Sequence, residues 1–117
     1  MEEKITVLVK EPGKDARLER IVPTLETFRK LLKGHLESVW VKDNVYMYVD
    51  EEGKLKGKEP NFRWRHGDTV VGTAVFVAAG DGGVEISLTD EQIKAIEFEL
   101  ELRKLITTPF FQIVVII

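Results

Sequence analysis

The sequence predicts an α+β fold: a single domain, residues 1–117, in which two helices pack against a mostly antiparallel mixed sheet. Residues 67–79, GDTVVGTAVFVAA, form the longest β-branched and apolar run. Glycine-containing turns flank this run, as expected of a central strand that is buried on both faces. Residues 24–33 and the segment that begins at Thr89 show helical spacing. The order β-β-α-β-β-β-β-α-β fits helices laid against such a sheet.

Composition narrows the function classes. The 117 residues are 44% hydrophobic and 32% charged, which is typical of a folded domain. A formal net charge of -3 excludes recognition of a polyanion by overall charge alone. The chain has no cysteine, which excludes disulfides, thiolate metal sites and cysteine nucleophiles. No apolar signal core follows Met1, and the apolar tail is far shorter than the roughly 20 residues of a membrane helix. We therefore expect a cytoplasmic protein that makes no contact with membranes.

The N-terminal third predicts a β-hairpin followed by a helix. Residues 5–10 are β-branched, a Pro-Gly pair signals a turn, and residues 17–22 form the second arm. Thr24 is a suitable N-cap for the helix, and Gly34 lies where a left-handed glycine ends many helices. The apolar residues of this helix share one face: Leu25, Phe28, Leu31 and Leu32.

Two strands at residues 36–41 and 44–50 form the most aromatic part of the chain. Alternation places Tyr46 and Tyr48 on one face of the second strand and its aliphatic residues on the other. The simpler interpretation is cross-strand packing with the hydroxyls at the surface. The alternative is a platform for a flat ligand, in a small-ligand pocket that includes His66.

The polar connection at residues 51–66 contains the sharpest local signal. Its cations can neutralise phosphates and its aromatic rings can stack on bases, which predicts binding of single-stranded nucleic acid or of another ligand. The candidate contacts are Lys54, Lys56, Lys58, Phe62, Arg63, Trp64, Arg65 and His66. The alternative is a solvated connection whose aromatic side chains turn inward and whose cations balance the acids of the second helix.

The last third predicts a strand, a helix and a strand-like tail. Residues 84–88 form a short strand, and Thr-Asp-Glu-Gln from Thr89 onward is a capping box for a helix that Pro109 would end. One apolar stripe of this helix consists of Ile93, Ile96 and Leu100, and a second of Phe98, Leu102, Leu105 and Ile106. Residues 107–117 form an apolar tail that should pair within the fold or with a partner.

A helix with two apolar stripes either lies between layers or offers one stripe to another chain. We therefore expect self-association or a protein partner. The candidate interface residues are Phe98, Leu102, Leu105, Phe110, Phe111 and Ile113.

Five phrases, taken in order, resemble one family. They are VLVKEPGK at 7–14, TLETFRKLLKG at 24–34, EEGKLKG at 51–57 followed by Pro-Asn, GDTVVGTAVFV at 67–77 and SLTDEQI at 87–93. Over roughly residues 5–96 they resemble domain of unknown function 3846, a family of small proteins from Firmicutes, their phages and related mobile elements. The resemblance implies a bacterial or phage intracellular setting, and it brings no activity, cofactor or catalytic residue.

The sequence contains no HExxH, GxSxG or P-loop pattern. His66 and Asp68 resemble the start of a base–orienter pair, but His-Gly-Asp before a strand is more simply a turn. The acids near Asp81 lack a metal-ligand spacing, so we expect no metal and no cofactor. The resulting hypothesis is a non-enzymatic binding protein of unknown target. The alternatives are binding of single-stranded nucleic acid through residues 54–66 and binding of a small ligand.

Overall fold

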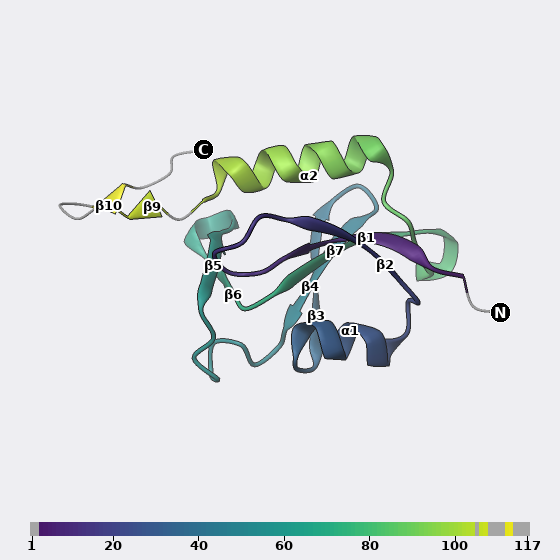
Figure 1. The fold of residues 1–117 in the computed structure, drawn as a ribbon, viewed down its shortest axis with the longest axis horizontal. Coiled ribbons are helices and arrows are strands. Elements are labelled where there is room, and N and C mark those ends of the chain that lie inside the picture. Colours follow the sequence, from purple (N-terminus) through teal and green to yellow (C-terminus); the bar gives the residue numbers. More distant parts are fainter. Residues whose placement is uncertain (1–2, 105, 108–111, 114–117) are drawn as a thin grey trace.

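The core of the fold is an antiparallel sheet with the strand order β2-β1-β7-β4-β3, to which β8 adds by pairing with β7 (Figure 1). The computed structural model describes residues 3–104, 106–107 and 112–113. The strands of this sheet are β1 (Ile5–Lys10), β2 (Arg17–Ile21), β3 (Leu36–Lys42), β4 (Val45–Asp50), β7 (Ala74–Ala79) and β8 (Glu85–Ile86). Every pairing among them is antiparallel.

Two helices cover opposite faces of this sheet, α1 (Leu25–Leu32) on one side and α2 (Asp90–Leu102) on the other (Figure 1). A second, two-stranded sheet consists of β5 (Pro60–Arg63) and β6 (Thr69–Val71). Beyond α2, β9 (Ile106–Thr107) pairs with β10 (Gln112–Ile113). The predicted fold class, α+β with two helices against a mostly antiparallel sheet, is confirmed.

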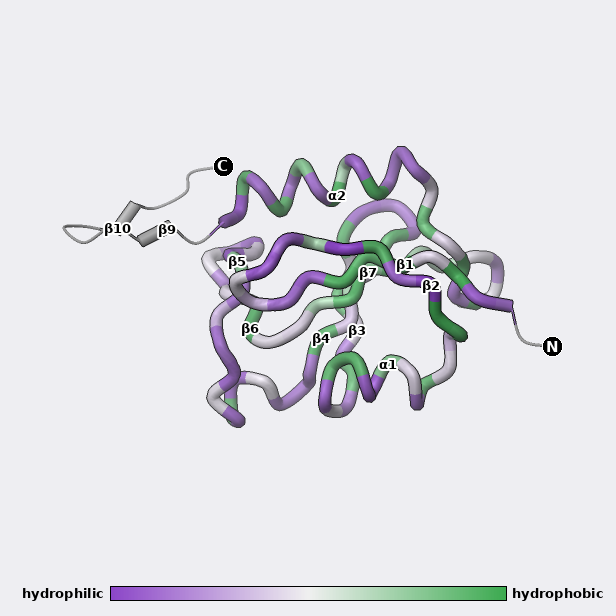
Figure 2. The backbone as a smooth tube through the Cα atoms, in the orientation of Figure 1, coloured by the Kyte–Doolittle hydropathy of each residue, from purple (hydrophilic) through white to green (hydrophobic). Residues whose placement is uncertain are grey.

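The central strand β7 is buried on both faces because it lies between the two helical layers. Its Val75 and Val77 pack toward α1, while Phe76 lies in the cluster that α2 covers. Figure 2 shows the backbone of β7 coloured hydrophobic throughout, whereas α2 alternates between hydrophobic and hydrophilic residues. Each face of the sheet therefore has its own apolar core, and β7 contributes to both.

The prediction of one strand over residues 67–79 was wrong in its extent. Gly72 adopts a positive φ of 72°, and its N–H donates a 2.8 Å hydrogen bond to the Glu59 carbonyl. This bend separates β6 from β7, so β6 pairs with β5 rather than with the central sheet. The polar connection at residues 51–66 therefore contains a strand, β5, that its composition did not reveal.

The predicted helix boundaries need two corrections. In α1 the N-cap is Thr24 as predicted, but the left-handed residue at the C-terminal end is Lys33, with φ 56°, and not Gly34. In α2 the capping box of Thr89 and Gln92 is present, but the helix ends at Leu102, well before Pro109. The predicted strand at residues 84–88 is also shorter, because β8 spans two residues.

Gly34 is required by a close approach rather than by its backbone angles. A Cβ atom at this position would lie 2.5 Å from Cγ and Oδ2 of Asp50. Any other residue would therefore push the Asp50 carboxylate out of its place beside the end of α1.

We predict that Gly34→Ala lowers the free energy of unfolding by about 1–3 kcal/mol, the range for overpacking a buried site. Urea denaturation at pH 7 measures this change. In an Asp50→Ala background the same substitution should cost much less, because the atoms that it clashes with are gone. Equal costs in both backgrounds would contradict this account of Gly34.

Candidate functional site

Asp50, at the end of β4, is the centre of a buried ion cluster. Its side chain is 2% exposed, and its Oδ2 lies 2.8 Å from Lys56 Nζ and 2.6 Å from Lys58 Nζ. The N–H of Glu52 donates to Oδ1 at 2.9 Å. Lys58 Nζ also donates to the Leu32 carbonyl at 2.7 Å. The two lysines thus neutralise a buried carboxylate and bind the free carbonyls at the C-terminal end of α1.

The electrostatics of this cluster keep Asp50 ionised. Burial alone would raise the pKa of Asp50, but hydrogen bonds from Lys56 and Lys58, with a smaller contribution from the Glu52 N–H, outweigh it. The net effect lowers the pKa of Asp50 from 3.8 to about 2. Lys56 and Lys58, which the sequence analysis predicted as nucleic-acid contacts, are therefore paired with a buried structural carboxylate.

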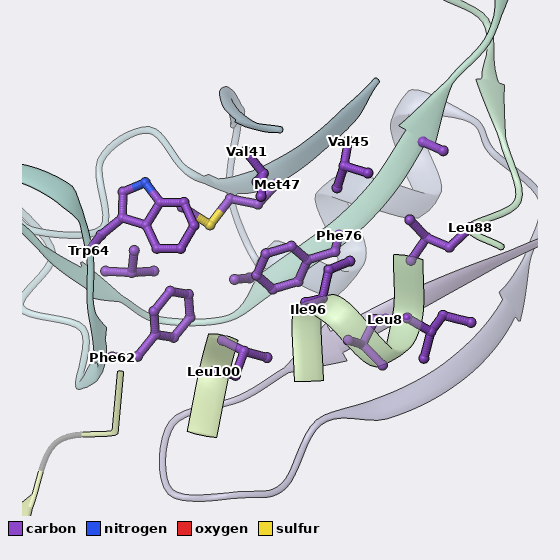
Figure 3. Close-up of a cluster of buried hydrophobic side chains, with 14 residues drawn as sticks. Leu8, Val41, Val45, Met47, Phe62, Trp64, Phe76, Leu88, Ile96 and Leu100 are labelled. Carbon is purple, nitrogen blue, oxygen red and sulfur yellow. The ribbon is translucent and has the colours of Figure 1, made fainter. Parts of the chain in front are cut away.

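The aromatic residues of the same stretch belong to the core. Phe62 is 1% exposed and Trp64 is 9% exposed, and Figure 3 shows both rings in the buried cluster that also contains Met47, Phe76 and Leu100. Lys54 pairs with Asp68 at 2.5 Å, Arg63 is half-buried, and His66 is exposed. Neither Phe62 nor Trp64 therefore offers an exposed ring face for a base to stack on, and both rings turn inward, as the alternative interpretation predicted.

A row of alternating rings and guanidinium groups closes the edge of the fold near Trp64. The Arg65 guanidinium lies 4.8 Å from the Trp64 ring centroid and 5.8 Å from that of Trp40. The Arg103 guanidinium also lies over the Trp64 ring, 4.7 Å from its centroid. Arg65 Nη2 also donates to the Val41 carbonyl at 2.6 Å. These contacts join β3, the segment after β5 and the end of α2.

Trp40 is the member of this row that the sequence analysis missed as a site residue. Its ring is 55% exposed, and its Nε1–H donates to the Asp43 carbonyl at 2.9 Å. The sequence held a signal, since a tryptophan in a strand with alternating polarity faces either the core or a partner. Alternation alone, however, does not show that the Arg65 side chain reaches the Trp40 ring.

The two tyrosines of β4 lie on the α1 side of the sheet, and His66 lies in the turn between β5 and β6. Tyr48 packs edge-on against Phe28 at 4.9 Å, and its hydroxyl donates to Glu85 Oε2 at 2.7 Å. Burial, then this hydrogen bond, raise the pKa of Tyr48. Both tyrosines lie on the α1 side of the sheet, whereas His66 follows Trp64, which packs in the cluster on the α2 side.

A cleft of about 650 Å³ lies between the turn after β1, strand β5 and the C-terminal half of α2. Lys10 Nζ donates to Asn61 Oδ1 at 2.9 Å and to the Glu11 carbonyl at 2.8 Å. Asn61 Nδ2 donates in return to the carbonyls of Lys10 and Gly72, both at 2.8 Å. Burial lowers the pKa of Lys10. The polar groups at the base of this cleft are therefore used to hold the second sheet against β1.

The remaining candidate is the side of α2 that faces away from the sheet. Ile93, Ile96 and Leu100 are buried against the sheet, whereas Phe98 is 68% exposed and Leu102 is 39% exposed. We call this surface the outer face of α2; it consists of Glu91, Lys94, Ala95, Phe98, Glu101 and Leu102, all exposed. Of the other predicted interface residues, Leu105, Phe110 and Phe111 lie outside the described residues. Ile113 of β10 pairs with Ile106 of β9.

The chain belongs to the family described as Domain of unknown function (DUF3846), whose model matches residues 5–101. The match confirms the family resemblance drawn from the five phrases. No curated protein and no solved structure matches this chain.

Residues 3–104 contain no group of three or more His, Asp or Glu side chains arranged to hold a metal ion. Among the helices of the part that the structure describes, none has both the length and the apolar composition for crossing a bilayer.

We predict that Asp50→Asn lowers the free energy of unfolding at pH 7 by about 2–3 kcal/mol, the contribution of hydrogen bonds to a charged group. Because the folded pKa of Asp50 is depressed, its contribution is complete above pH 3.8 and is lost as the pH falls toward about 2. Urea denaturation between pH 2 and pH 7 should show a shallower acid limb for the variant. The exposed control Asp81→Asn should keep the limb of the unsubstituted protein, and an unchanged limb in Asp50→Asn would contradict the assignment.

Proposed function

We propose that this chain is a non-catalytic protein-binding module whose contact surface is the outer face of α2. The observation that carries the proposal is Phe98, a large aromatic side chain that is 68% exposed on a regular helix. Leu102 follows one helical turn later and is also exposed. Single exposed apolar residues are common on protein surfaces, but an aromatic and an aliphatic residue at i and i+4 form a ridge of the kind that helices insert into grooves.

The rest of α2 supports this role. Its inner stripe is held in the core, so the outer face is presented on a fixed scaffold and loses little conformational entropy when it binds. Acids flank the ridge at Glu91 and Glu101, and a lysine lies at Lys94. Polar residues around an apolar centre are the usual anatomy of a protein interface.

The strongly shifted titratable groups support binding rather than catalysis. Asp50 is committed to two lysines, and Tyr48 to Glu85. Both groups are therefore engaged in holding elements of the fold together.

We predict that a photo-reactive phenylalanine analogue, p-benzoylphenylalanine, in place of Phe98 forms a discrete cross-linked product when the full-length protein is irradiated in its host cells. The matched control carries the same analogue in place of Val84, which is 64% exposed and lies outside α2. Gel mobility and mass spectrometry of the products identify the partner. No product at position 98, or equal products at both positions, would argue against the outer face of α2 as the contact surface.

A further inference from the structure

The outer face of α2 carries opposite charges on the two sides of Phe98. Lys94 lies four residues before Phe98 and Glu101 three residues after it, so the three side chains follow one another along one stripe. Glu101 pairs with Lys104 at 2.9 Å, but the two side chains are 69% and 51% exposed. An exposed pair of this kind contributes little, so it leaves Glu101 able to meet a second cation.

This charge pattern distinguishes two ways in which a helix can meet a copy of itself around a two-fold axis. In a parallel pair each residue faces its own copy, which would place Lys94 against Lys94 and Glu101 against Glu101. In an antiparallel pair centred on Phe98, Lys94 of one copy lies opposite Glu101 of the other. Like charges repel and opposite charges attract, so the pattern favours the antiparallel arrangement.

The spacing along the helix fits the same arrangement. With a rise of about 1.5 Å per residue, Lys94 lies about 6 Å before Phe98 and Glu101 about 4.5 Å after it. The mismatch between Lys94 and the opposing Glu101 is then only about 1.5 Å, which the long lysine side chain spans easily. Ala95 lies next to Phe98 on this face and leaves room for the opposing ring.

We propose that a second copy of this chain docks on the outer face of α2 as an antiparallel helix pair, with Phe98 against Phe98 and Lys94 against Glu101 of the second copy. This inference rests on the proposed function, since it names the partner of the same surface. Because of the two-fold symmetry, the Lys94–Glu101 contact occurs twice in the dimer. A single helix face is small compared with the roughly 800 Å² per partner of a standard interface, so the dimer is weak and its population depends on concentration.

Sedimentation equilibrium of the full-length protein over a wide concentration range tests the arrangement by charge reversal. Lys94→Glu and Glu101→Lys should each weaken dimerisation at least tenfold, because each places like charges together at two symmetric contacts. The double variant Lys94→Glu/Glu101→Lys should restore the dissociation constant to within about threefold, since it re-creates opposite charges in every contact. Lys30→Glu, an exposed helical lysine on α1, is the matched control and should change nothing.

The possible outcomes separate this inference from the proposed function on which it rests. If Phe98→Ser abolishes the dimer but neither charge reversal changes its dissociation constant, the antiparallel arrangement is overturned. The outer face of α2 would then remain the contact surface. A monomer at all concentrations, with a cross-link from position 98 to a different protein, would overturn the second copy as the partner. A dimer that persists in Phe98→Ser would overturn the second copy as the partner of this face, and a monomer with no cross-link at position 98 would overturn both.

Discussion

The buried carboxylate of Asp50 is the interaction on which the arrangement of the α1 layer depends. It fixes three pieces of chain at once: the end of β4 that carries it, the lysines of the following connection, and the last carbonyls of α1. Gly34 makes the approach possible because it has no side chain. A charge this deeply buried is costly unless it is paired, so the connection after β4 cannot move away without leaving Asp50 unpaired. The lysine-rich connection is therefore an ordered part of the fold.

The position of α2 follows from the need to cover the second face of the sheet. Because β7 buries both of its faces, each face needs its own cover, and α1 together with the Asp50 cluster closes only one. The second cover is α2, reinforced by β5 and β6, whose Phe62 and Trp64 fill the remaining space (Figure 3). Once Ile93, Ile96 and Leu100 are committed to the sheet, helical geometry turns Phe98 and Leu102 outward. The exposed ridge is thus a geometric consequence of how the core is filled.

The features that follow from local chemistry were predictable from the sequence. The N-caps Thr24 and Thr89, the alternation along β4 and the apolar content of β7 all depend on neighbouring residues, and all are present. The features that the sequence did not predict depend on contacts between residues far apart in the chain. Gly72 ends a strand because its N–H bonds to Glu59, and the cations of the connection are occupied because Asp50 lies nearby in space. Composition identified the basic and aromatic stretch, but only the long-range packing of β5 and of the residue after it decides that Phe62 and Trp64 point inward.

The row of rings and guanidinium groups beside Trp64 gives the protein a built-in optical reporter. The chain has two tryptophans, and both contact Arg65, one at the surface and one in the core. Trp64 is also covered by Arg103, the residue that caps α2. Indole emission from this chain therefore arises at a single seam, where the edge of the sheet meets the end of the helix. Detachment of α2 would expose Trp64 to water and shift its emission to longer wavelength, while changes confined to the α1 side would leave the colour of the emission unaltered.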